Sequence, residues 1–258
     1  MDGTTEPIIA VIGHPIAGNP SQFAIERALD ALELEWRVLS FDVHPEHIAA
    51  ALEGFKVTGI AGVMIEASVM PVAAQWYATK IEPDVDVAAI DCLYRDESLH
   101  FRASAEQRAW INETVGAHEP LTRLWIGARD ATLPIDASLF EDENVVETAN
   151  SDRIAAARLI VLANEPEFSA PQGDSKVPLK MTPAKLDLDD WPVNDGSTFV
   201  IDLTDEHPDR DAIIERGYQW IGPHQRRVGM LVKCFERWTG DQSSPDVISD
   251  AIEEYLGV

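Results

Sequence analysis

Hydrophobic and polar positions follow two different periods along the first hundred residues. Ile8–Gly13 is a continuous run of small and β-branched apolar residues, which is typical of a buried strand. Residues 21–33 instead place Ile25, Leu29 and Leu32 on one face at helical spacing. Similar patterns continue to Phe101, with strands expected at 36–41, 59–65 and 87–94 and helices at 45–54 and 72–79. This alternation predicts an α/β layer.

The second half of the chain repeats the alternation less regularly. Residues 105–115 predict a connecting helix, and residues 121–127 predict the first strand of a second α/β unit, followed by strands at 144–148, 158–163 and 198–203. Residues 166–192 contain five prolines and little periodicity, which predicts an extended surface loop. Helices are expected at 208–216 and 225–239. A last helix begins after Ser243 and ends at Gly257.

Charge excludes two classes of partner. Twenty Lys and Arg against 45 Asp and Glu leave a net charge of −25 at pH 7, which repels nucleic acid and anionic membranes. The amino terminus lacks the basic residues of a secretory signal, and no apolar run approaches the roughly 20 residues that span a bilayer. We therefore expect a soluble, cytoplasmic protein. The acidity fits either a salty cytoplasm or ordinary solubility.

Few residues carry a recognisable metal-binding or catalytic pattern. Cys92 and Cys234 lie far apart without zinc-ligand spacing, so both are expected to be buried apolar residues. His44 and His47 bracket a helix start and are expected to be exposed surface residues. No phosphate-binding loop, Ser/His/Asp order or Gly-x-Ser-x-Gly occurs, so hydrolase and nucleotide-triphosphatase functions have no support.

Both ends of the sequence resemble one enzyme family. The opening VIGHPIAGNPSQFAIERALDAL, with WRVLSFDV and GIAGVMIEA, resembles the substrate-binding domain of shikimate dehydrogenases. The run GMLVKCFERWTG and the helix after it resemble the two carboxy-terminal helices of that family. The resemblance implies a substrate-binding-type α/β domain (1–103) and a trimmed, degenerate Rossmann-like domain (104–222). Carboxy-terminal helices (223–258) would return to pack on the first domain.

The family's ligand positions are partly kept. Its two serines, which bind the carboxylate of a hydroxylated cyclohexene acid, correspond to Asn19 and Ser21, although Ser21 could instead be an ordinary helix N-cap. A threonine position holds Glu66, and an asparagine position holds Asp91. Two carboxylates beside one cleft disfavour an anionic ligand, and Lys233 could offset them only if it points inward.

The family's catalytic positions are changed. Its proton-exchanging lysine corresponds to Met70, and its catalytic aspartate corresponds to Ala105. Neither side chain can carry a proton, so the resemblance predicts no catalytic residue at these positions.

The cofactor motifs are also changed. Gly127 is kept after the first strand of the second unit, but Arg129 and Asp130 stand where further glycines would let a dinucleotide approach the backbone. Ser151 stands at the arginine that clamps the NADP phosphate in the family. No cofactor is therefore expected, and Gly127 is a weak candidate.

Three hypotheses follow from the sequence. The first is a non-catalytic relative that binds a small molecule or a partner through the family's cleft. The second is an NADP-dependent shikimate or quinate oxidoreductase with divergent site residues. The third is a structural subunit of a larger complex.

Overall fold

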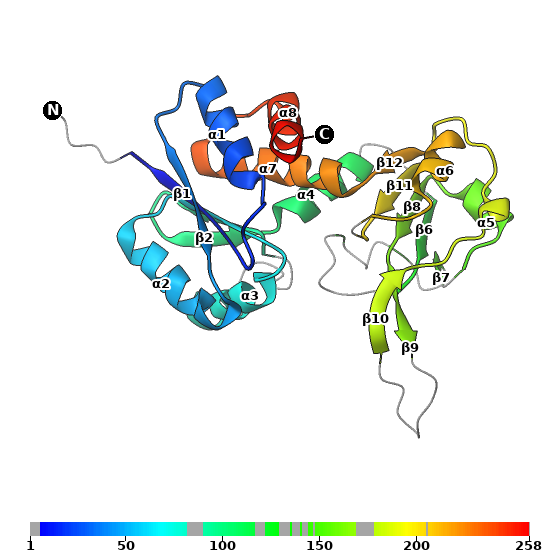
Figure 1. Cartoon of the computed structure of the whole chain (residues 1–258), viewed down its shortest axis with the longest axis horizontal. Helices are drawn as coiled ribbons and strands as arrows, with labels where there is room; N and C mark the ends of the chain where they lie inside the picture. The colour runs from blue at the N-terminus through cyan, green and yellow to red at the C-terminus, as the bar shows by residue number, and fades with distance from the viewer. Residues whose placement is uncertain are drawn as a thin grey trace, which may run out of the picture. The chain divides into compact units, whose positions relative to one another are not determined.

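The chain forms two compact units in a computed structural model that describes residues 6–81, 90–116, 122–128, 135, 140, 144–146, 148–168, 178–204 and 206–257. Unit 1 comprises Met1–Trp110 and Arg227–Val258, and unit 2 comprises Ile111–Arg226 (Figure 1). Among the described residues, no helix has both the length and the apolar character needed to span a membrane.

Unit 1 is built on a mixed sheet. Its strands are β1 (Ile8–Gly13), β2 (Arg37–Asp42), β3 (Gly62–Ile65), β4 (Cys92–Arg95) and β5 (Phe101–Ser104), in the order β2-β1-β3-β4-β5. β1 pairs in parallel with β2 and β3, and β4 is antiparallel to both of its neighbours. The carboxyl ends of β1, β2 and β3 therefore meet at one edge of the sheet.

Helices cover both faces of this sheet. Alternate residues of β1 point to opposite faces, so Ile9 and Val11 pack in one cluster while Ala10 and Ile12 pack in another. The first cluster includes residues of α1 (Ser21–Ala31), α7 (Pro223–Thr239) and α8 (Pro245–Leu256). The second includes residues of α2 (Ile48–Thr58) and α3 (Met70–Lys80), and a short 3₁₀ turn, η1 (Pro45–His47), precedes α2. Figure 1 shows the two helix groups on opposite sides of the sheet.

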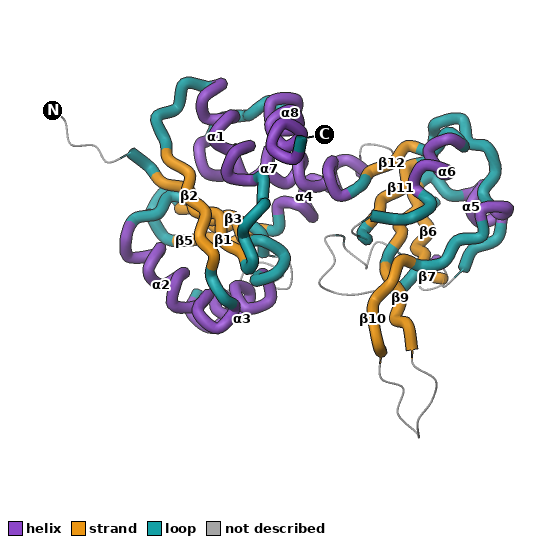
Figure 2. Tube along the Cα trace, in the orientation of Figure 1, coloured by secondary structure: helices purple, strands orange, loops and turns teal. Residues whose placement is uncertain are grey.

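Unit 2 is built on a parallel sheet. Its strands are β6 (Arg123–Ile126), β7 (Val145–Val146), β8 (Leu159–Leu162), β11 (Phe199–Asp202) and β12 (Gln219–Ile221), in the order β12-β11-β8-β6-β7. The helices of this unit include α5 (Ser151–Ala156) and α6 (Arg210–Glu215), and α4 (Glu106–Gly116) begins in unit 1 and ends in unit 2. β9 (Asn164–Phe168) and β10 (Pro178–Pro183) form a separate antiparallel ladder, followed by the turn η5 (Leu188–Asp190) (Figure 2).

The α/β fold class expected from the sequence is confirmed, but two local predictions are wrong. The helix expected to end at Gly54 continues to Thr58, where Gly59 takes a left-handed φ of 77°. Gly54 is tolerated inside α2 because its backbone is ordinary and open space surrounds it. The stretch 166–192 is not one extended loop, because residues 166–168 and 178–183 belong to the β9–β10 ladder. Prolines are compatible with such a ladder at edge positions that need no N–H donor.

Three short elements were not predicted from the sequence. The strands β5 and β12 and the helix α5 were not expected, since each spans only three to six residues. The strand expected at 87–94 begins at Cys92 in the described part of the chain, and residues 87–89 lie outside it.

Candidate functional site

Glu66 lies at the carboxyl edge of the unit 1 sheet, directly after β3. Its backbone N–H donates to the carbonyl of Ile12 at 2.9 Å, and its carbonyl accepts from Val69 and Met70 at 3.0 and 3.1 Å. A Cβ atom added to Gly13 would lie 2.9 Å from the Cβ of Glu66, so glycine is needed for this close approach. The backbone of Glu66 is thus fixed between the end of β1 and the start of α3.

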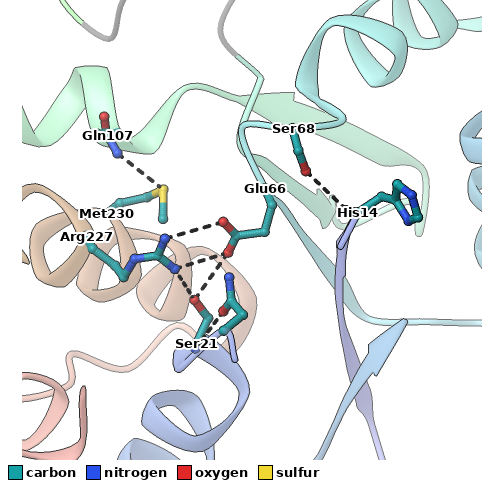
Figure 3. Close-up of polar contacts among 8 residues, drawn as sticks. His14, Ser21, Glu66, Ser68, Gln107, Arg227 and Met230 are labelled. Atoms are coloured by element: carbon teal, nitrogen blue, oxygen red, sulfur yellow. Dashed lines mark hydrogen bonds and ion pairs between the residues drawn. The ribbon is translucent and has the colours of Figure 1, made fainter. Parts of the chain in front are cut away.

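The carboxylate of Glu66 is held by two side chains from other elements (Figure 3). Arg227 on α7 donates to Oε1 at 3.2 Å and to Oε2 at 3.5 Å, and Ser21 Oγ donates to Oε1 at 3.3 Å. Arg227 also donates to Ser21 Oγ at 2.9 Å. The Glu66 side chain is 13% exposed and that of Arg227 is 32% exposed. A planar guanidinium facing both carboxylate oxygens is a strong recognition geometry for a carboxylate.

Two of the expected ligand residues, Asn19 and Ser21, join this cluster. Ser21 is the first residue of α1 and its N-cap is Pro20, so the N-cap alternative for Ser21 is wrong. Asn19 Oδ1 accepts the Ser21 N–H at 2.8 Å and so orients the turn that carries the hydroxyl.

Arg227 is the residue of this cluster that sequence reasoning missed. It lies four residues before Leu231 and seven before Cys234, both fully buried, so it belongs to the apolar stripe of α7. A charged residue on an apolar stripe is the signal that could have identified it, since such a charge is normally paired.

Asp91 lies elsewhere in unit 1 and anchors a helix. Its two carboxylate oxygens accept the backbone N–H groups of Glu106 at 2.6 Å and Gln107 at 2.8 Å, the first residues of α4. Burial raises the pKa of Asp91 from 3.8 to about 7, with a smaller contribution from the charge of Glu106, while the two N–H donors act in the opposite direction. A perturbed pKa can mark a catalytic carboxyl. Asp91 is only 2% exposed, however, and both of its oxygens are engaged.

Glu106 is buried beside Asp91 and is 1% exposed. It accepts a 2.8 Å hydrogen bond from Arg237 of α7, and this bond raises the pKa of Arg237. The Asp91 region is therefore a packed polar link between β4, α4 and α7.

Met70 and Ala105, which the resemblance aligns with the family's acid and base, lie at the starts of two helices. Met70 is the first residue of α3 and packs against the cluster under α2 and α3. Ala105 precedes α4, and its carbonyl accepts the N–H of Ala109 at 2.9 Å. Neither side chain has a group that titrates.

His14 and Asp42 form a second polar pair at the same sheet edge. His14 follows β1, its Nδ1 lies 2.8 Å from Asp42 Oδ1 at the end of β2, and its backbone N–H donates to Ser68 Oγ at 3.1 Å. Both side chains of the pair are exposed, at 40% and 54%. His44 and His47 are exposed as predicted, whereas nothing in the sequence indicated a role for His14. Within the described ranges, no group of three His, Cys, Asp or Glu could hold a metal ion.

Gly127 in unit 2 lies close to the backbone of a neighbouring segment. Its φ is 109°, and an added Cβ would lie 2.5 Å from the carbonyl oxygen of Ala163. The next N–H, that of Ala128, donates to the carbonyl of Asn164 at 3.0 Å. Arg129 and Asp130, expected to block a dinucleotide, lie outside the described residues.

The second cofactor position, Ser151, begins α5. The helix is capped by Asn150, whose side chain accepts the N–H of Arg153 at 3.1 Å. A cavity of about 160 Å³ lies beside this turn, and its lining includes Ile126, Lys185 and Trp191. It is smaller than the roughly 300 to 1,000 Å³ typical of sites for whole cofactors.

Comparisons with known proteins bear on the whole chain. No family model matches the sequence. The NADP-dependent shikimate dehydrogenase of Methanopyrus kandleri is 24% identical over 279 residues, covering 96% of both chains. Among solved structures, the 5-ketofructose reductase of Gluconobacter sp. strain CHM43 aligns with a TM-score of 0.69 and 14% identity over 98% of this chain and 99% of that one. The shikimate 5-dehydrogenase of Thermus thermophilus, solved with NADP(H) and shikimate, aligns with a TM-score of 0.66 and 16% identity over 97% of this chain and all of that one.

The fold is therefore that of the two-domain α/β oxidoreductases represented by shikimate dehydrogenase. Similarity in sequence also extends over nearly the full length of two curated shikimate dehydrogenases, at 24% and 22% identity, and supports a divergent member of that family.

Proposed function

We propose that this chain is a ligand-binding member of the shikimate dehydrogenase family that does not carry out the family's NADP-dependent oxidation. The proposal rests on the side chains found at the family's two acid/base positions. A thioether at Met70 and a methyl group at Ala105 replace groups that exchange a proton with the reacting oxygen. Positioned acid/base groups contribute roughly a hundredfold to ten-thousandfold to such reactions.

The two carboxylates that could replace the missing groups already accept hydrogen bonds from other groups of the protein. Glu66 is paired with Arg227 and Ser21, and Asp91 accepts two backbone N–H groups of α4. A proton relay needs a group that can reach the ligand, and both carboxylates already have their partners within unit 1.

We also propose that the chain binds no dinucleotide cofactor. Relatives are named as NADP-dependent enzymes. In this chain Gly127 serves a close backbone contact, the N–H of Ala128 is engaged with Asn164, and Ser151 supplies no positive charge for a phosphate. These residues do not fit a diphosphate, which needs free N–H donors at a glycine-rich turn.

Purified protein incubated with shikimate or quinate and NADP tests the proposal. We expect no formation of NADPH above background, while the shikimate dehydrogenase of Thermus thermophilus in the same buffer serves as the positive control. Turnover of about one per second or faster, within the range ordinary for enzymes, would overturn the proposal.

The exposed pair of His14 and Asp42 favours one second candidate. If turnover is observed, an oxidoreductase that uses His14 as its acid/base group, oriented by Asp42, is the alternative. In that case His14→Gln should abolish the turnover, whereas His47→Gln, a change at an exposed histidine nearby, should leave it unchanged.

A further inference from the structure

Arg227 and Ser21 together make a donor set suited to a carboxylate. The guanidinium presents two N–H groups in one plane, and the hydroxyl donates from a second direction to the same oxygen. Ser21 is fully buried and Arg227 is about two-thirds buried, so neither donor is a freely moving surface group. The arrangement would recognise the carboxylate of a small organic acid.

A carboxylate of the protein itself occupies this donor set. The Glu66 carboxylate receives all three donors, and its backbone is fixed by hydrogen bonds to β1 and α3. Because the backbone is held, the side chain reaches the donors without ordering a flexible loop. An incoming carboxylate would have to displace an occupant that is covalently attached and already positioned.

A second carboxylate beside Glu66 is also opposed by charge. Two carboxylates that share one guanidinium repel each other strongly in a partly buried site. The net charge of −25 adds a long-range repulsion for any anionic ligand.

We propose that Glu66 is the built-in occupant of a carboxylate site formed by Arg227 and Ser21, and that it determines specificity by excluding carboxylic acids from unit 1. The inference rests on the proposed function, because it describes the ligand class of the same unit. The ligand of unit 1 is accordingly a polar molecule without a carboxylate, whose recognition does not need these donors.

Removing Glu66 tests the inference, with acetate as the probe and acetamide as its neutral counterpart. Glu66→Ala should unfold at a lower temperature than the wild type, since it leaves the charge of Arg227 unpaired. Acetate, but not acetamide or an equal ionic strength of chloride, should raise its melting midpoint toward the wild-type value. Calorimetric titration should show acetate binding about tenfold tighter or more in Glu66→Ala than in the wild type. In the variant the acetate carboxylate can contact Arg227 directly, whereas in the wild type it is repelled by Glu66 and has to displace it.

Two further variants make the test specific. Adding Arg227→Met to Glu66→Ala should remove the acetate effect. Glu254→Ala is the matched control, because it deletes the carboxylate of an exposed pair with Arg27, whose side chains are 59% and 46% exposed. The guanidinium of Arg27 remains hydrated in this variant, so acetate should not raise the melting midpoint of Glu254→Ala. If Glu66→Ala does not fold, Glu66→Ser leaves similar room and carries the same expectation.

Equal acetate affinity in the wild type and Glu66→Ala would overturn the inference, as would tight binding of shikimate by the wild type. The experiment uses no cofactor and measures no turnover, so it is separable from the proposed function. A wild type that binds shikimate without oxidising it contradicts the inference alone, and a wild type that oxidises a substrate without a carboxylate contradicts the proposed function alone.

Discussion

Asp91 couples the stability of unit 1 to pH in a way that one substitution can isolate. Burial raises the pKa of this carboxyl from 3.8 to about 7 in the folded chain. Between these two values the folded state holds a proton that the unfolded state has released. The stability that this group contributes is therefore complete below about pH 3.8 and is lost as the pH rises through about 7.

The magnitude follows from the two pKa values. One pKa unit corresponds to about 1.4 kcal/mol, so the difference between 3.8 and about 7 corresponds to a loss on the order of 4 kcal/mol across the whole range. Asp91→Asn removes the titration. The amide has one carbonyl oxygen for the two N–H donors of Glu106 and Gln107, so the variant also loses about 1 kcal/mol at every pH.

The pH dependence of the free energy of unfolding can be measured by urea unfolding, followed by tryptophan fluorescence. The wild type and Asp91→Asn are compared from pH 5 to pH 8. The free energy of unfolding of the variant relative to the wild type should rise by about 1.4 kcal/mol per pH unit up to the pKa of Asp91 and then level off. The other acids contribute to both proteins and cancel in the difference. Asp250→Asn, at an exposed acid of α8, should give a curve parallel to that of the wild type. A parallel curve for Asp91→Asn as well would refute the reasoning.

Four further outcomes are expected. Gly229→Ala on α7 would drive a Cβ into the ring of Trp110, so it should destabilise the fold by about 1 to 3 kcal/mol despite the better helix propensity of alanine. Gly54→Ala on α2 should stabilise the fold by up to about 1 kcal/mol, because no atom lies within 4 Å of the added Cβ. A Gly229→Ala variant that is as much stabilised against urea as Gly54→Ala would contradict the steric argument. Potassium chloride should raise the melting midpoint because ions screen the self-repulsion of a chain with a net charge of −25, and a flat or falling midpoint up to molar salt would show that this repulsion is unimportant. NADPH should give no saturable quenching of tryptophan fluorescence below millimolar concentration, and a micromolar dissociation constant after inner-filter correction would contradict the interpretation of Gly127 and Ser151.

The sequence by itself determined the elements whose signals are local. The strand β1 has the residues expected from its apolar run, and α1 and α8 carry apolar residues at helical spacing on their buried faces. Gly257 ends α8 in the left-handed conformation, with a φ of 73°, as its position after the last apolar residue predicted. Hydrophobic period and helix termination act over a few neighbouring residues, so they can be recognised without the fold.

The partners of the charged groups were decided only by the tertiary structure. Glu66 and Arg227 are 161 positions apart, and neither neighbourhood indicates that a residue after β3 and a residue of α7 will share a hydrogen-bonded pair. Asp91 looked like a ligand residue from its position in the family motif, yet the return of the chain through β5 places the start of α4 over its carboxylate. Gly127 was a weak cofactor candidate from the sequence, and only the structure shows the close approach of the Ala163 backbone to it. Burial and pairing of charge depend on which distant segments fold together, because the energy of a charge is set by everything within a few ångströms of it and not by its neighbours along the chain.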